Sequence, residues 1–289
     1  MSIKKLSYFF ILIKYLDFME RILNINAIQQ VASHRKVFLK TVQQASKPYF
    51  TKNKPQTRKK GQFTHFLSLP MATESLAKGL EKWKQEILAQ KYETIYPRLF
   101  QDPNKAHFTL CMLTLQSEQE VELAREAMRS VEEYIQKLVV GRGQNGKLFL
   151  EFDNLGYFGS LEETNVIHFE LKEEGEQFEL LKDVIHVLIK AMIDYKVIDK
   201  RDLSHIRFNS KTKRFENEKL HLTLINSSFG KKELMQNNNR YTFIGRPIIE
   251  NHKSQLKASS ASPNQIQLST RFHYDDKTGF YLSQYNINI

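Results

Sequence analysis

The sequence contains one short pattern twice, as Lys105-Ala106-His107-Phe108-Thr109-Leu110 and as Lys219-Leu220-His221-Leu222-Thr223-Leu224. Each copy is a lysine, one intervening residue and then His-x-Thr-Leu, and the two histidines are 114 residues apart. Side chains two residues apart in a β-strand project from the same face. The pattern therefore predicts two strands, one in each half of a duplicated fold. Each histidine shares a face with its threonine while the intervening apolar residue is buried.

Two imidazoles that face one phosphate suit phosphodiester chemistry without a metal ion. A neutral histidine removes a proton from water or a hydroxyl, and a protonated histidine gives one to the leaving oxygen. Both forms are accessible because free histidine titrates near pH 6.5, and such proton transfers contribute about 10²–10⁴-fold. A threonine hydroxyl can donate a hydrogen bond to a phosphate oxygen. A single His-x-Thr favours a structural histidine, whereas two copies in apolar strands favour a shared site.

The rest of the sequence predicts an α+β fold with two or three long helices on the outside. A serine followed three residues later by glutamate is typical of a helix start, and Ser117 and Glu120 have this spacing. Glycines 141, 143 and 146 predict a turn, and the polar stretch 230–262 predicts a surface excursion. The predicted helices are 74–92, 117–138 and 176–195. The predicted strands are 63–70, 107–115, 148–152, 166–171, 220–227, 265–274 and 279–287, the last two forming a hairpin.

These segments resemble the 2H phosphoesterase superfamily, whose signature is two His-x-Thr/Ser motifs that face each other across a cleft. The resemblance covers about residues 62–289, and three runs carry it: Thr64–Pro70, His107–Glu118 and Leu220–Asn226. They look like the branch that holds the phosphoesterase domain of activating signal cointegrator 1 complex subunit 1 and the A-kinase anchoring protein domain similar to 2′-5′ RNA ligases. The resemblance implies a bilobal, duplicated fold with two antiparallel sheets lining a central cleft and helices outside.

The resemblance also implies roles for individual residues. His107 and His221 would be the catalytic acid and base, and Thr109 and Thr223 would hold the phosphate. No metal ion or cofactor is implied. Activities in the superfamily include hydrolysis of 2′,3′-cyclic phosphates and of 2′-5′ or 3′-5′ linked oligonucleotides. We therefore expect a nucleotide or a short RNA end in the cleft.

The net charge of +11 is concentrated at the N-terminus. Residues 1–60 carry 13 lysines and arginines against two acids, which leaves 30 basic and 30 acidic residues in 61–289. The basic isoelectric point is therefore no sign of a nucleic-acid-binding surface on the globular part. Residues 1–60 also contain no glycine. A KH module needs a Gly-x-x-Gly loop, so we expect no KH-type RNA-binding module there.

Residues 1–61 read as a basic N-terminal extension that ends in a linker, before a phosphoesterase-like domain over 62–289. The apolar run 6–13 is too short to span a bilayer, which needs about 20 residues. The segment after it is basic, poor in acids and compatible with an amphipathic helix, as organelle-targeting segments are. We expect mitochondrial targeting. The alternative is a helical arm that contacts a protein assembly or a membrane surface, in a cytoplasmic or nuclear protein.

For several other residues that could belong to a functional site, the sequence favours a structural role. His168 and Glu170 share a strand face, but no further ligands follow at a useful spacing, so we assign no metal site. Tyr157 and Phe158 have rings that stack on bases in some proteins, and packing is the favoured interpretation. The single cysteine, Cys111, excludes an internal disulfide.

The leading hypothesis for function is a metal-independent phosphoesterase that acts on RNA-type or nucleotide 2′/3′ phosphodiesters. One alternative is a catalytically silent accessory or scaffold subunit of a mitochondrial assembly, motivated by the long basic arm. Another is a regulatory module that binds a mononucleotide without turnover. The motif itself does not separate catalysis from binding.

Overall fold

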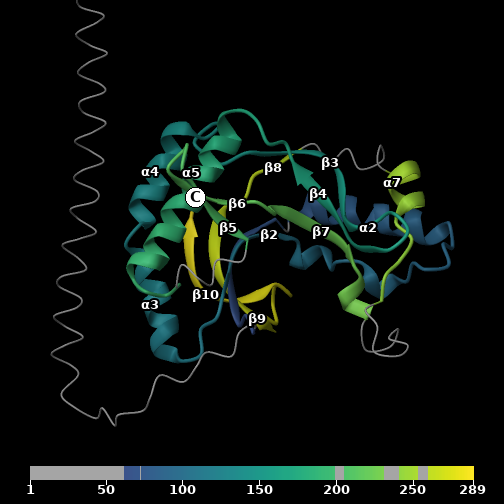
Figure 1. Ribbon diagram of the computed structural model, residues 1–289, viewed down its shortest axis with the longest axis horizontal. Coiled ribbons are helices and arrows are strands. Elements are labelled where there is room, and N and C mark those ends of the chain that lie inside the picture. The colour runs from purple at the N-terminus through teal and green to yellow at the C-terminus, as the bar shows by residue number, and fades with distance from the viewer. Residues whose placement is uncertain (1–61, 72, 199–204, 231–240, 253–259) are drawn as a thin grey trace, which may run out of the picture. The chain divides into compact units, whose positions relative to one another are not determined.

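A computed structural model of the chain describes residues 62–71, 73–198, 205–230, 241–252 and 260–289. Mixed helices and strands alternate along this part of the chain (Figure 1). The helices are α2 (Glu74–Ala89), α3 (Glu118–Arg129), α4 (Glu132–Arg142), α5 (Glu176–Asp194) and α7 (Arg246–His252). The strands are β1 (His65–Pro70), β2 (His107–Leu113), β3 (Leu150–Gly159), β4 (Thr164–Leu171), β5 (Ile206–Asn209), β6 (Arg214–Asn217), β7 (His221–Asn226), β8 (Ser260–Ala261), β9 (Gln265–Tyr274) and β10 (Tyr281–Asn288).

Eight of these strands form one curled sheet in the order β10-β9-β1-β2-β7-β4-β3-β8, and every neighbouring pair is antiparallel. The predicted α+β class with an antiparallel sheet is confirmed. The two sheets expected from the resemblance correspond to the two halves of this eight-stranded sheet, which join where β2 meets β7. The half with β2 contains strands from both ends of the domain, and the half with β7 contains β3 and β4 from its middle. A simple duplication would build each half of the sheet from one half of the sequence. Here the half with β2 takes strands from both ends of the domain instead.

The junction between β2 and β7 is short. Only Phe108 and Leu222 are paired, and both side chains are fully buried. Next to this pair, the N–H of Gln101 donates to the carbonyl of Leu224 at 2.7 Å. The side-chain amide of Asn217 donates to the carbonyls of Thr109 and Leu110 at 3.1 and 3.0 Å. The flanking polar groups are thus satisfied without further ladder pairs, and the sheet can bend here.

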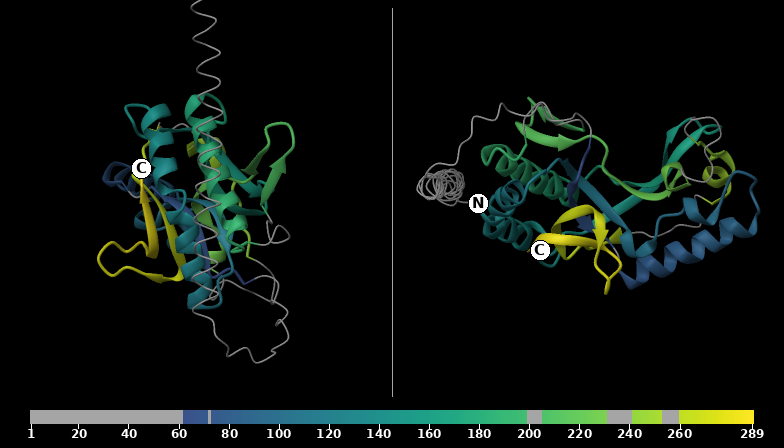
Figure 2. Two further views of the ribbon diagram at one scale, coloured as in Figure 1. Left: turned by 90° about the vertical axis from the view of Figure 1, so that its left-hand side faces the viewer. Right: turned by 90° about the horizontal axis from the view of Figure 1, so that it is seen from below.

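The helices lie at two ends of the domain. Helices α3 and α4 pack on α5 and on β10 at one end, while α2 and α7 lie at the other (Figures 1 and 2). Helix α2 begins at the N-cap Thr73, whose hydroxyl accepts from the N–H of Leu76 at 3.2 Å. Its buried residues are Leu76, Leu80, Trp83 and Ile87, whose spacing puts them on one face of the helix.

The predicted helix 117–138 is two helices. Its start is confirmed, since the Ser117 hydroxyl accepts from the N–H of Glu120. The chain bends after α3, where the hydroxyl of Ser130 donates back to the carbonyl of Ala127 at 2.8 Å. Such back-bonding by serine competes with the helical ladder and bends helices. The turn prediction was wrong at Gly141, which lies inside α4.

The predictions missed the hairpin of β5 and β6 and the short helix α7. Both strands of the hairpin have only four residues, which is too short for an alternation of apolar and polar residues to identify a strand, and β6 is partly exposed along its whole length. The hairpin is held on α5 by Arg214, which contacts Glu179 and Asp183 at 2.9 and 3.1 Å. Helix α7 lies in the predicted excursion 230–262 and buries Ile248 and His252. Residues 231–240 and 253–259 of that stretch lie outside the described residues.

The predicted N-terminal extension, with its proposed targeting or docking role and its linker, lies outside the described residues, so those assignments stay predictions. Among the helices that the structure describes, none combines the length and the hydropathy needed to cross a bilayer.

We expect Phe108→Ala to lower the free energy of unfolding by about 3–5 kcal/mol, because a fully buried ring is lost at the only paired residue of the junction. Urea denaturation measures this change. The matched control is Phe272→Ala, at a ring that is 57% exposed on β9, which we expect to cost less than about 1 kcal/mol. Equal losses at the two positions would contradict the central role of the junction.

Candidate active site

The two His-x-Thr motifs lie on β2 and β7, the two central strands of the sheet. Both strands start with the same burial pattern: a partly exposed histidine, a buried apolar residue, a partly exposed threonine and two buried residues. Because Phe108 pairs with Leu222 and both point into the core, the residues on either side point to the opposite face. The structure therefore brings His107, Thr109, His221 and Thr223 together on one face, as the motif spacing predicts.

Both histidines are held by the same backbone contact. The Nδ1 atom of His107 lies 2.7 Å from the carbonyl of Lys105, and Nδ1 of His221 lies 2.6 Å from the carbonyl of Lys219. A carbonyl only accepts, so each Nδ1 carries the proton and donates it. Nε2 is then the basic nitrogen of each neutral ring. The sequence contained this signal as the lysine two residues before each histidine, but the contact uses the backbone of that lysine and not its charge.

The side chains that surround His107 are mainly aromatic. Its ring centroid lies 5.1 Å from that of Phe66, 5.3 Å from that of Tyr281 and 6.0 Å from that of Phe280. Burial lowers the pKa of His107 to about 4, against the opposing effect of the Lys105 carbonyl, and His221 lowers it further. His107 is therefore neutral at pH 7.

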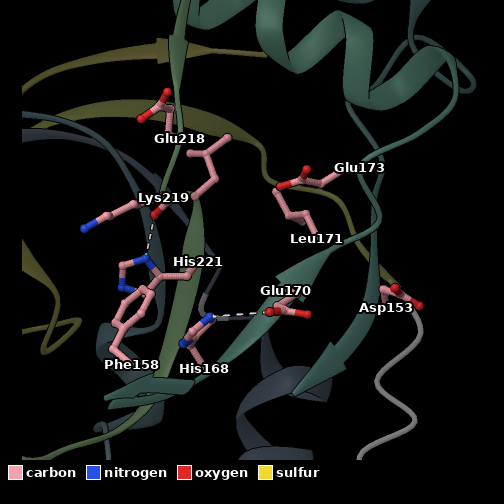
Figure 3. A pocket seen from close by; sticks show the side chains of 10 residues that line it. Asp153, Phe158, His168, Glu170, Leu171, Glu173, Glu218, Lys219 and His221 are labelled. Carbon is pink, nitrogen blue, oxygen red and sulfur yellow. Dashed lines mark hydrogen bonds and ion pairs between the residues drawn. The ribbon is translucent and has the colours of Figure 1, made fainter. Parts of the chain in front are cut away.

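His221 lies between two other rings. Phe158 on β3 and His168 on β4 both approach it edge-on, with centroid distances of 5.0 and 5.1 Å (Figure 3). Burial lowers the pKa of His221, the Lys219 carbonyl raises it, and the charges of His205 and Lys219 lower it. Phe158 was interpreted from the sequence as a packing residue. It is partly buried, and one of its packing partners is this histidine.

His168 is a functional candidate that sequence reasoning did not place at the site. It is only 5% exposed and is the cross-strand partner of Thr223. Its Nδ1 has no hydrogen-bond partner within the described residues, and its Nε2 lies 4.0 Å from the Glu170 carboxylate, too far for a hydrogen bond. Burial, and secondarily His221, lowers the pKa of His168 to about 4, so the ring is neutral at pH 7.

Gly156 makes room for His168 on the neighbouring strand. The two residues are paired between β3 and β4. A Cβ atom at position 156 would lie 2.6 Å from Nε2 of His168 and 2.3 Å from the carboxylate of Glu170. Any larger residue would push both side chains out of place.

A pocket of about 450 Å³ opens beside His221 (Figure 3). One wall is formed by His221, Lys219 and Phe158, and four of the other lining residues carry carboxylates. The lining residues are Asp153, Phe158, His168, Glu170, Leu171, Glu173, Glu218, Lys219, Leu220 and His221. Within the described ranges, no group of three or more histidine, cysteine or acidic side chains is arranged to hold a metal ion.

A curled antiparallel sheet that presents two His-x-Thr motifs on its central strands defines a 2H phosphoesterase-type protein. The sequence profile of the AKAP7 2′5′ RNA ligase-like domain matches residues 63–289. The chain therefore belongs to this family, and the resemblance inferred from the motifs is confirmed.

Individual proteins with similar sequences are less than 30% identical to this chain. The chain is 28% identical over 133 residues to A-kinase anchor protein 7 isoform gamma of Homo sapiens, covering 46% of this chain and 35% of that protein. It is 26% identical over 236 residues to activating signal cointegrator 1 complex subunit 1 of Mus musculus, covering 75% of this chain and 61% of that protein. The chain thus spans about a third and about three fifths of these two relatives.

Solved structures with a similar arrangement have low sequence identity. The protein TT0787 of Thermus thermophilus is 14% identical with a TM-score of 0.43, over 78% of this chain and 97% of that one. LigT of Escherichia coli, in a complex with NADP+, is 11% identical with a TM-score of 0.40, over 78% of this chain and 97% of that one.

We expect His168 to make the stability of the domain depend on pH. An unfolded histidine titrates near pH 6.5 and this one near 4, so between these values the unfolded chain binds a proton that the folded domain does not. Stability is therefore lost as the pH falls through this window. From pH 7 to pH 5 the wild type should lose about 2 kcal/mol more unfolding free energy than His168→Phe.

Urea denaturation at the two pH values checks this difference. The control is Phe272→Ala, at an exposed position on β9, which removes no titratable group and should keep the pH dependence of the wild type. A His168→Phe variant with the same loss as the wild type would show that the pKa of this ring is not depressed in the folded domain.

Proposed function

We propose that this protein is a metal-independent phosphoesterase that acts on RNA-type or nucleotide 2′/3′ phosphodiesters. Its membership of the 2H phosphoesterase-type family supports a phosphoesterase-like function. The observation that carries the proposal is the repeated tether: two histidines on one sheet face, each with Nδ1–H bound to the carbonyl of a lysine two residues earlier. This leaves two Nε2 atoms to move protons, one on each side of a bound phosphate.

The two histidines divide the proton transfers between them. His107 is neutral at pH 7, so its Nε2 takes the proton from the attacking water or hydroxyl. The phosphate charge beside His221 favours the imidazolium form, because an opposite charge nearby stabilises it. His221 then gives its Nε2 proton to the departing ribose oxygen as the P–O bond breaks. The next turnover requires the reverse exchange with water.

The threonines hold the phosphate. Among the described residues, the hydroxyls of Thr109 and Thr223 have no hydrogen-bond partner, and both lie on the same face as the histidines. Each can donate to a non-bridging oxygen whose negative charge grows in the transition state.

We expect His107→Ala and His221→Ala each to lower kcat by about 10²–10⁴-fold in EDTA, because each removes one proton transfer. The assay uses 2′,3′-cyclic nucleotides and short 2′-5′ and 3′-5′ oligonucleotides. His273→Ala, at an exposed position on β9, is the matched control and should keep full activity. Activity that needs a divalent metal, or that survives loss of both histidines, would overturn the mechanism. A folded wild type that is inactive on every substrate would favour the silent accessory subunit.

We expect Thr109→Val and Thr223→Val each to lower kcat by about 10²–10³-fold, the usual effect of removing one donor to a developing oxyanion. Valine keeps the shape of threonine, so the strands should stay folded, which circular dichroism can verify. Thr212→Val, on the exposed turn between β5 and β6, is the control. If the two site variants keep wild-type kcat, the hydroxyls do not contact the phosphate.

A further inference from the structure

The pocket beside His221 carries negative charge where a phosphodiester-binding cleft would be expected to be basic. Its carboxylates come from separate elements: Asp153 from β3, Glu170 from β4, and Glu173 and Glu218 from the segments that follow β4 and precede β7. Glu218 is paired with Arg207 at 2.9 Å. No ion pair within the described residues neutralises the carboxylates of Asp153, Glu170 and Glu173, apart from the 4.0 Å approach of the neutral His168 to Glu170.

Glu170 is the carboxylate closest in the sheet to the candidate catalytic residues. It is the direct cross-strand partner of His221, just as His168 is the partner of Thr223. Side chains of such partners lie on the same face of the sheet, a few ångströms apart. Figure 3 shows the His168 ring between His221 and Glu170, at the edge of the pocket. Glu170 is thus the pocket carboxylate that is paired in the sheet with a histidine of the motif, and His168 lies beside both.

His168 adds a second, independent sign of a ligand. Its ring is almost completely buried, lines the pocket and leaves Nδ1 without a partner among the described residues. Buried polar atoms in folded proteins nearly always have hydrogen-bond partners, and an orphan one calls for an explanation. Because the ring lines the pocket, a ligand there that reaches Nδ1 when it binds, directly or through a retained water, would satisfy it.

We propose that this pocket receives the nucleobase of the substrate and that Glu170 selects guanine. The inference rests on the proposed function for placing a nucleotide phosphate between the two histidines, and it adds the identity of the nucleoside. A further phosphate would be repelled by the carboxylates, whereas an uncharged base would not. Phe158 forms part of the pocket wall beside His221. Its ring packs on His168, with centroids 4.5 Å apart, and a base can stack on the part of the ring that lines the pocket.

The selection follows from the hydrogen-bonding edges of the bases. A carboxylate has two acceptor oxygens and no donor. Guanine offers it two adjacent donors, the ring N1–H and the exocyclic amine. Adenine and cytosine offer one amine next to a ring nitrogen that only accepts, and uracil offers one N–H between two carbonyls that repel the carboxylate. A bidentate pair of this kind contributes about 1–3 kcal/mol, or roughly 5–150-fold, against the wrong base.

The test compares the 2′,3′-cyclic phosphates of guanosine, adenosine, cytidine and uridine with the full-length protein in EDTA. For the wild type we expect kcat/KM for guanosine to exceed that for uridine by at least about tenfold. Glu170→Gln replaces one acceptor by a donor and should reduce the ratio to below about threefold. The control is Glu174→Gln, an exposed carboxylate outside the pocket, which should keep the wild-type ratio. A ratio unchanged by Glu170→Gln, or a preference for uridine, overturns the proposal.

Binding separates this inference from the proposed activity. If none of the four cyclic phosphates is turned over, calorimetry with guanosine 3′-monophosphate and uridine 3′-monophosphate replaces the kinetic assay. Binding of the guanosine nucleotide at least about tenfold tighter, lost in Glu170→Gln, supports the pocket although the proposed activity has failed. Equal affinities for the two nucleotides, or no binding of either, overturn the pocket as well.

Discussion

The pairing of Phe108 with Leu222 is the contact on which the site depends. It is the only paired position between β2 and β7, and it joins the two halves of the eight-stranded sheet. Because both side chains are fully buried, the neighbouring histidines and threonines must lie on the other face. A slip of one residue on either strand would send one histidine into the core. The apolar pair thus sets the register of the polar residues.

The two copies of the motif make the same contact between histidine and backbone, but different side chains surround each histidine. Each histidine is tethered to a carbonyl two residues earlier, with nearly equal distances. His107 then faces the rings of Phe66 and Tyr281, whereas His221 faces Phe158, His168 and a pocket of carboxylates. Proton transfer needs two groups that behave differently at one pH, and the packing around each ring supplies that difference.

Short-range patterns in the sequence predicted much of this structure. The His-x-Thr spacing predicted two strands and the shared face of their polar residues, and Ser117 marked the start of a helix that the structure confirms. The bend at Ser130 was not predicted, because it depends on a hydrogen bond from the Ser130 hydroxyl to the Ala127 carbonyl. The spacing of apolar residues gives no sign of that bond. The four-residue strands of the β5–β6 hairpin were missed, since they are held by contacts to α5.

The position of His168 could not be predicted from the sequence, although the alternation of β4 placed it on one face with Glu170. Its place beside His221 depends on the register between β4 and β7, strands that are separated by a helix and a hairpin. It depends also on Gly156, which lies on a third strand. Contacts of this kind become visible only when several strands are assembled, so a histidine pattern on one strand gives no sign of them.

The order of strands in the sheet constrains how the chain reaches this state during synthesis. β1 lies between β2 and β9, and its residue His65 pairs with Thr270 near the end of the chain. The half that holds His221 takes its main strands from the middle of the domain, so it can assemble while the last residues are still inside the ribosome. The half that holds His107 has to wait for β9 and β10, and until then β1 has an open edge. In a nascent chain β1 can pair with β2, but its other edge stays exposed until β9 has been translated, about two hundred residues later, and an exposed apolar edge favours aggregation.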